Sequence, residues 1–162
     1  MTNVIAALKA LSNFNCEERQ KALAAFEATW SNDPLVLDKW FSIQATSRLA
    51  ETPERVIALM NHSGFDIKNP NRVRALLGAF FMMNLAHFHA SDGAGYAFFS
   101  RQVLALDALN PQVAARMMGA IIHWRRYDSH RQTLMKAEIE KIIDTESISL
   151  DVYELAAKSL DK

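Results

Sequence analysis

The sequence is poor in the residues on which turn-rich and disulfide-linked folds depend. Its 162 residues include 5 glycines, 4 prolines and a single cysteine, Cys16. So few glycines and prolines argue against a β-sandwich, a β-barrel or a glycine-rich nucleotide-binding loop. A lone cysteine cannot form a disulfide within its own chain, and this usage is typical of proteins from a reducing compartment.

The sequence also lacks an excess of charge and a long apolar run. Lys and Arg together number 18, as do Asp and Glu, so no net charge attracts nucleic acid or anionic lipid. No apolar run reaches the roughly 18 residues of a membrane span. The first eleven residues have no basic segment of the kind that opens a secretion signal, and Lys9 interrupts their apolar character. We therefore predict a soluble cytoplasmic protein without a membrane partner.

What is present suits a packed globular domain. Half of the residues are apolar and 22% are charged, a composition that supports a hydrophobic core and excludes disorder. The length falls within the range of about 100–200 residues that one domain occupies. We expect residues 1–162 to form a single domain.

Each of the four prolines follows a residue that is favoured at a helix N-cap. These residues are Asp33, Thr52, Asn69 and Asn110. Proline is tolerated at the first helical position because its missing N–H would have no partner there, and the residue before it accepts a free amide hydrogen bond. The four junctions therefore predict four helix starts, and the Ser-Asp-Gly at 91–93 predicts a fifth.

The segments between these junctions have helical periodicity, and no segment alternates as a strand would. We expect helices near residues 2–12, 16–31, 34–48, 53–62, 70–84, 93–109, 111–127, 129–144 and 149–160. Short turns between them make successive helices antiparallel, and a helix pair about every 40 residues is the period of armadillo and HEAT arrays. The predicted fold is all-α: a superhelical array of antiparallel helix pairs, an armadillo/HEAT-like α-solenoid.

The residues reveal no catalytic or metal centre. There is no H-E-x-x-H pair, no P-loop and no G-x-S-x-G. The five histidines are not spaced as metal ligands, so structural roles in turns are favoured over a metal site; they are His62, His87, His89, His123 and His130. Cys16 has no histidine partner at a fixed spacing, which favours an inert thiol.

Arginines near two helix starts are the most unusual local feature. Arg72 and Arg74 fall in the first turns after Pro70, and Arg116 falls just beyond the first turn after Pro111. A cation at a helix N-terminus costs about 0.3–1 kcal/mol at exposed positions. Such arginines, together with free backbone amides, could bind an anion such as a peptide carboxylate. Spacing alone favours the alternative, that they pair with acidic residues of neighbouring helices.

Residues 123–127 (HWRRY) mix cations and aromatic rings, as nucleic-acid sites do. Here the cations fall in the last turn of an expected helix, where the helix dipole favours them. With a net charge of zero, the sequence favours no nucleic-acid partner.

Five short segments of the sequence resemble segments of a known protein family and occur in the same order and spacing. They are LDKWFSIQAT (37–46), NPNRVRALLGAF (69–80), FHASDGAGY (88–96), NPQVAAR (110–116) and RYD (126–128). Together they resemble the carboxy-terminal helical domain of the bacterial aminopeptidase N family, alanyl aminopeptidases of the gluzincin zinc metallopeptidases. The resemblance covers nearly the whole chain and implies an α-helical superhelix that caps a catalytic domain and encloses a large cavity.

The family's catalytic motifs are absent from this sequence. The family binds zinc through H-E-x-x-H and a downstream Glu, and holds the substrate's α-amino group with a G-A-M-E-N strand; neither motif occurs here. The resemblance therefore implies that zinc and catalysis belong to the rest of a longer polypeptide, which removes N-terminal residues from peptides. We expect this chain alone to be inactive, to bind no zinc, and to have the catalytic domain as its partner.

The resemblance also implies three substrate-binding residues. In family members, the residues that match Arg74, Gln112 and Arg116 lie on the cavity face and approach the downstream part of a bound peptide, including its carboxylate. We expect these three to bind the peptide here. An alternative function remains open, that of a stand-alone helical-repeat adaptor which binds a protein or peptide in its groove.

Overall fold

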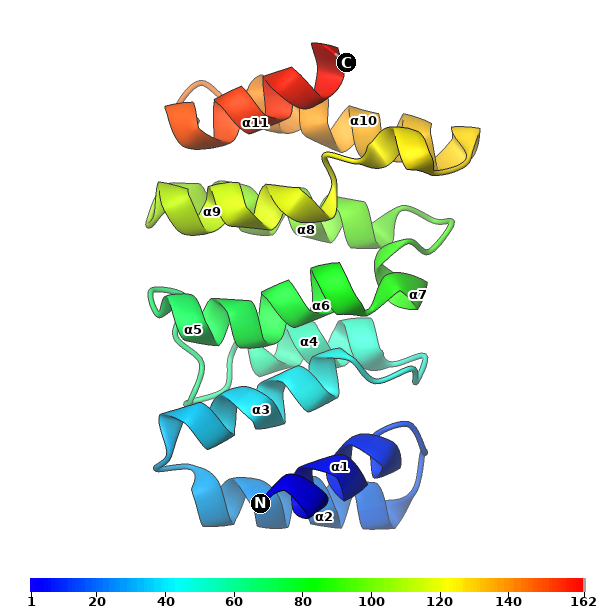
Figure 1. The fold of residues 1–162 in the computed structure, drawn as a ribbon, viewed down its shortest axis with the longest axis vertical. Helices are drawn as coiled ribbons and strands as arrows, with labels where there is room; N and C mark the ends of the chain where they lie inside the picture. The colour runs from blue at the N-terminus through cyan, green and yellow to red at the C-terminus, as the bar shows by residue number, and fades with distance from the viewer. Residues whose placement is uncertain (162) are drawn as a thin grey trace. The chain divides into compact units, whose positions relative to one another are not determined.

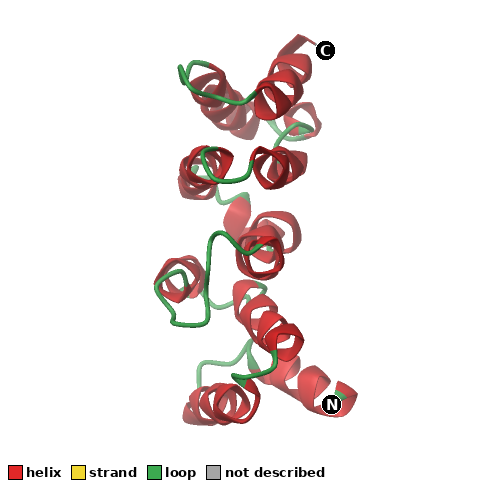
Figure 2. Ribbon diagram, turned by 90° about the vertical axis from the view of Figure 1, so that its left-hand side faces the viewer, coloured by secondary structure: helices red, strands yellow, loops and turns green. Residues whose placement is uncertain are grey.

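A computed structural model describes residues 1–161, and all of its regular secondary structure is helical. Figure 2 shows helices and connecting loops and no strand in this described part of the chain. The all-α prediction is therefore confirmed. The final residue of the expected domain, Lys162, lies outside the described residues. The chain divides into two compact units, Met1–His87 and Phe88–Lys162, which we describe separately.

The first unit is built around α3. Its helices are α1 (Thr2–Leu11), α2 (Glu17–Trp30), α3 (Pro34–Ala45), α4 (Thr52–Leu59), α5 (Pro70–Val73), a π-helical turn (Arg74–Gly78) and α6 (Ala79–Met83). Figure 1 shows α3 between the α1–α2 hairpin and the helix formed by α5, the π turn and α6. Trp40 of α3 is 2% exposed, and its indole N–H donates to the carbonyl of Leu23 at 2.9 Å. Buried rings of this kind supply most of the apolar area that stabilises the unit.

The second unit is built mainly from four helices. They are α8 (Ala94–Asp107), α9 (Pro111–Met117), α10 (Ser129–Ile143) and α11 (Leu150–Asp161), with 3₁₀ turns at Met118–Ala120 and Trp124–Arg126. A further short helix, α7 (Leu85–Phe88), ends at the first residue of this unit. Its core holds large side chains with no more than 1% exposure, among them Tyr96, Phe99, Met118, Ile121 and Ile139.

Three of the four predicted N-caps are confirmed. The side chains of Asp33, Asn69 and Asn110 accept hydrogen bonds from backbone amides two or three residues later, at 3.0–3.3 Å. The fourth predicted helix start is also present, but Thr52 does not cap it, because Thr52 is itself the first residue of α4 and the N-cap position is Glu51. The Thr52 amide donates to the Leu49 carbonyl at 3.0 Å, and Thr52 lies one position inside the helix rather than at its N-cap.

The fifth predicted start, at 91–93, is also confirmed. Gly93 adopts a left-handed conformation with φ of 74° directly before α8, which glycine accepts without steric cost. The Asp92 carboxylate accepts a hydrogen bond from the Ala94 amide at 3.0 Å.

The single helix predicted over 111–127 is wrong. Helix α9 ends at Met117 and gives way to the two 3₁₀ turns. The cause is packing: the Trp124 indole N–H donates to the carbonyl of Ser159 at 3.2 Å, and the Arg125 guanidinium donates to Ser159 and Leu160 carbonyls. These contacts with the end of α11 hold residues 124–126 out of the path that a continued α9 would take.

Candidate functional site

Arg72 has a structural role. It is 6% exposed, and one guanidinium nitrogen donates to the Asp38 carboxylate of α3 at 2.6 Å. The guanidinium also lies 5.3 Å from the centre of the Phe41 ring, close enough for a cation–π contact. For Arg72, pairing with an acidic residue of a neighbouring helix is therefore the correct interpretation.

Arg74, two residues later, is exposed. Its guanidinium donates to the Asn71 side-chain carbonyl at 2.6 Å and forms no ion pair within residues 1–161. Since a guanidinium carries five N–H donors, most of its capacity is left for another acceptor. The structure places Arg74 where the sequence expected an anion site, at the start of the α5–α6 helix.

Arg74 also begins the π-helical turn. Within this turn the Ala79 amide donates to the carbonyl of Arg74, five residues earlier. The Ser42 hydroxyl lies 2.8 Å from the carbonyl oxygen of Ala75 and links the turn to α3. Single π turns inside α-helices are frequent at functional sites, and this one lies in the wall of a hollow.

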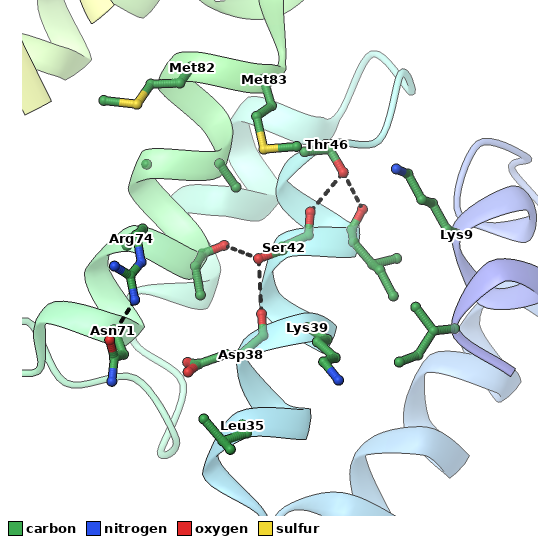
Figure 3. A pocket seen from close by; sticks show the side chains of 15 residues that line it. Lys9, Leu35, Asp38, Lys39, Ser42, Thr46, Asn71, Arg74, Met82 and Met83 are labelled. Carbon is green, nitrogen blue, oxygen red and sulfur yellow. Dashed lines mark hydrogen bonds between the residues drawn. The ribbon is translucent and has the colours of Figure 1, made fainter. Parts of the chain in front are cut away.

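That hollow, of about 700 Å³, lies between α3 and the α5–α6 helix, with α1 at its edge. We call it the α3–α6 hollow. Figure 3 shows Arg74 on one side, Lys9 and Lys39 on the other, and Met82 and Met83 along the wall. The volume falls within the range of about 300–1,000 Å³ that ligand pockets occupy.

Gln112 and Arg116 are brought together on α9. They are four residues apart, hence on one face of the helix, and both line a hollow of about 450 Å³ with Asp151 and Glu154 of α11. Both are exposed. In the described part of the chain Arg116 forms no ion pair, even with these carboxylates. Arg74 belongs to the other unit and lines a different hollow.

The histidines do not form a metal centre. No group of three or more His, Cys, Asp or Glu among residues 1–161 is arranged to hold a metal ion. His62 illustrates a structural role: its Nδ1 accepts from the Gly64 amide at 2.9 Å, so Nε2 bears the proton and donates to Glu27 at 2.7 Å. A zinc ion needs three or four ligands, and no site among the described residues has them.

In the second unit a buried histidine lies between two tyrosines, an arrangement that was not predicted from the sequence. His89 Nδ1 lies 2.9 Å from the Tyr96 hydroxyl and Nε2 lies 2.9 Å from the Tyr127 hydroxyl. The Arg131 side chain donates to the His89 carbonyl at 2.7 Å. Burial lowers the pKa of His89, as does the charge of Arg131, and burial raises the pKa of Tyr96 to about 12. The turn at Gly93 brings His89 and Tyr96 together, and helical spacing does not predict such a contact.

The HWRRY segment is also structural. The Arg125 guanidinium stacks on Trp124 at 4.2 Å and donates to the last carbonyls of α11, where the helix dipole favours a cation. These contacts use guanidinium donors of Arg125 that would otherwise be available to a phosphate backbone. In the part of the chain that the structure describes, no helix is both long and apolar enough to cross a membrane.

Comparison with known proteins shows the family to which this chain belongs. The family model described as "Domain of unknown function (DUF3458_C) ARM repeats" matches residues 1–161. Over 160 residues the chain is 43% identical to aminopeptidase N of Caulobacter vibrioides and 41% identical to that of Escherichia coli. Each match covers 99% of this chain and 18% of the relative, so the chain spans about a fifth of the length of these curated relatives.

A solved structure agrees with the sequence matches. The chain is similar to aminopeptidase A of Legionella pneumophila, crystallised in complex with aspartic acid, with a TM-score of 0.94 and 40% identity. That match covers 99% of this chain and 19% of the other. The chain thus belongs to the DUF3458_C family of ARM-repeat domains, the C-terminal helical domain of aminopeptidase N-like proteins.

Proposed function

We propose that this chain is a non-catalytic wall of the peptide chamber in a zinc-dependent aminopeptidase that removes N-terminal residues from peptides. Arg74, Gln112 and Arg116 contact the downstream part of the peptide. The proposal joins the two units of residues 1–162 into one domain of a longer polypeptide, whose catalytic domain is its partner. The similarity to aminopeptidases over 99% of the chain supports it.

The proposal rests on the contrast between one buried arginine, Arg72, and two exposed ones, Arg74 and Arg116. Arg72 is buried in an ion pair with Asp38, whereas Arg74 and Arg116 are exposed at hollows and form no ion pair among residues 1–161. A guanidinium binds a carboxylate through two parallel hydrogen bonds. The two exposed arginines are therefore suited to the carboxylate at the far end of a peptide.

The zinc of the proposed enzyme belongs to the rest of the polypeptide. No cluster among residues 1–161 can ligate a metal, so this chain contributes binding and enclosure of the peptide and no catalytic group. The single cysteine, half-buried Cys16, supports a cytoplasmic location, because reducing compartments keep thiols free.

The adaptor alternative is not favoured by any of these observations. Three curated relatives at 41–43% identity are all named aminopeptidase N, including that of Haemophilus influenzae. These relatives favour a domain of an aminopeptidase over a stand-alone adaptor.

The test uses the longer polypeptide that contains both this chain and the catalytic domain. Loss of a hydrogen-bonded charge pair weakens binding about tenfold or more, so Arg74→Ala or Arg116→Ala should raise KM for tri- and tetrapeptides by about that factor. KM for a single-residue amide should not change, because that substrate does not reach the hollows.

Arg101→Ala provides the matched control. Arg101 is an exposed arginine of α8 that lines neither hollow, and its loss should leave both values of KM unchanged. Equal changes in KM for the peptides and for the amide in the Arg74 and Arg116 variants would contradict the proposal.

A further inference from the structure

The α3–α6 hollow has positive charges that its own residues do not neutralise. Lys9, Lys39 and Arg74 are exposed in its lining, and the ammonium groups of the two lysines form no ion pair with any described residue. One acidic residue, Asp38, lines the hollow, and its carboxylate is bound to Arg72 at 2.6 Å. The space between these side chains therefore favours an anion.

The rest of the lining is apolar and accessible. Leu35, Met82 and Met83 are 69%, 43% and 64% exposed, and all three line the hollow. Methionine side chains are flexible and adapt to apolar groups of different shapes. A ligand that fits this surface has an apolar part beside an acidic group.

The positions of the cations on two sides of the hollow restrict which ligand can pair with all of them. Figure 3 shows Lys9 and Lys39 across the hollow from Arg74, the first residue of the π turn. A single small anion occupies one such side and leaves the other unpaired. A peptide with a terminal carboxylate and a second, side-chain carboxylate matches both sides at once.

We propose that the α3–α6 hollow selects peptides with an acidic residue beside an apolar residue downstream of the cleaved bond, and that Lys39 and Lys9 recognise the acidic side chain. The inference rests on the proposed function, in which Arg74 holds the terminal carboxylate. Lys39 and Lys9 are then specificity-determining residues and take no part in catalysis.

The test measures peptide binding to the 162-residue chain by NMR titration of its ¹⁵N-labelled amides at low ionic strength. The probes are Ala-Leu-Glu-Ala and Ala-Leu-Gln-Ala, which differ in one charge. An exposed ion pair contributes about a two- to fivefold change in affinity, so the chain should bind the Glu peptide about two- to fivefold more tightly. The shifted amide signals should map to α3 and the π turn.

Lys39→Gln should reduce this preference for the Glu peptide. The double variant, Lys9→Gln with Lys39→Gln, should abolish the preference. The affinity for the Gln peptide should stay the same in both variants. Lys21→Gln is the matched control. Lys21 is an exposed lysine of α2 paired with Glu17, it does not line the hollow, and its loss should leave the preference intact. Circular dichroism verifies that each variant is folded.

Three results would overturn the inference: equal affinity for the two peptides, an undiminished preference in the double variant, or no saturable binding. These results leave the KM test of Arg74 and Arg116 in the longer polypeptide unaffected. A rise in peptide KM there, without a Glu preference here, refutes the selectivity and retains the proposed function.

Discussion

Two arginines separated by one residue show how burial decides what a side chain does. Arg72 and Arg74 carry the same charge at the start of the same helix, where the dipole disfavours both. One turns toward α3 and is enclosed with Asp38 and Phe41. The other faces the α3–α6 hollow and keeps most of its donors free. The first stabilises the fold, and the second is available to a ligand.

The two arginines should therefore differ in their effect on stability. Arg72→Ala leaves the Asp38 carboxylate, which is 19% exposed, without its partner, and should lower the free energy of unfolding by about 3 kcal/mol. Arg74→Ala should change it by less than about 0.5 kcal/mol. Urea unfolding followed by circular dichroism measures both, and equal losses would contradict the assigned roles.

His89 should make the second unit sensitive to acid. Its pKa is lowered in the folded state by burial and by Arg131, so below the ordinary value of 6.5 the unfolded chain binds a proton more readily. The free energy of unfolding should therefore fall as the pH decreases from about 7.5 to about 5.5. Burial raises the pKa of Tyr96, which faces the ring, to about 12, so Tyr96 keeps its proton throughout this range.

A variant that cannot titrate isolates this effect. His89→Gln retains a hydrogen-bonding side chain, and the stability that it loses between the two pH values should be smaller than the wild-type loss. Urea unfolding at each pH gives the comparison. An equal loss in both proteins would show that His89 is not the group responsible.

At the scale of helices, the N-caps can be tested in pairs. Asn110 caps α9, so Asn110→Ala should lower the free energy of unfolding by about 0.5–2 kcal/mol. Thr52 also precedes a proline, but its buried hydroxyl has no partner among residues 1–161. Thr52→Val keeps the shape and removes the hydroxyl, and should be neutral or slightly stabilising. Comparable losses from both substitutions in urea unfolding would contradict the cap assignment.

The helices were predictable where local chemistry determines them. The side chains of Asp33, Asn69 and Asn110, each followed by proline, accept hydrogen bonds from amides two or three residues later. Because these bonds are local, the sequence predicts the helix starts. The break after Met117 was not predictable, because it depends on contacts of Trp124 and Arg125 with α11, about 35 residues away.

The candidate site was predictable only in part. Arg74 and Arg116 were predicted from helix starts and from the family resemblance, Gln112 from the resemblance alone, and the roles of all three remain predictions. Lys9 and Lys39 had no signal in the sequence, because they join the α3–α6 hollow only when α1 and α3 pack beside the π turn. The π turn itself has no sequence signature that helical periodicity detects.

At the scale of the whole molecule, the chain corresponds in length to about a fifth of the aminopeptidases that it matches. It contains no group of described residues that can hold a metal. We propose that it contributes a wall with exposed cations and that the remaining polypeptide carries out the chemistry on the peptide.

The most direct test of this account locates the far end of a bound peptide. A tetrapeptide with a photoreactive group on its C-terminal residue is cross-linked to the longer polypeptide, and mass spectrometry identifies the labelled segments. We predict labels within α3, the π turn or α9, beside Arg74 or Arg116. Labels confined to the polypeptide outside these 162 residues would contradict the central claim.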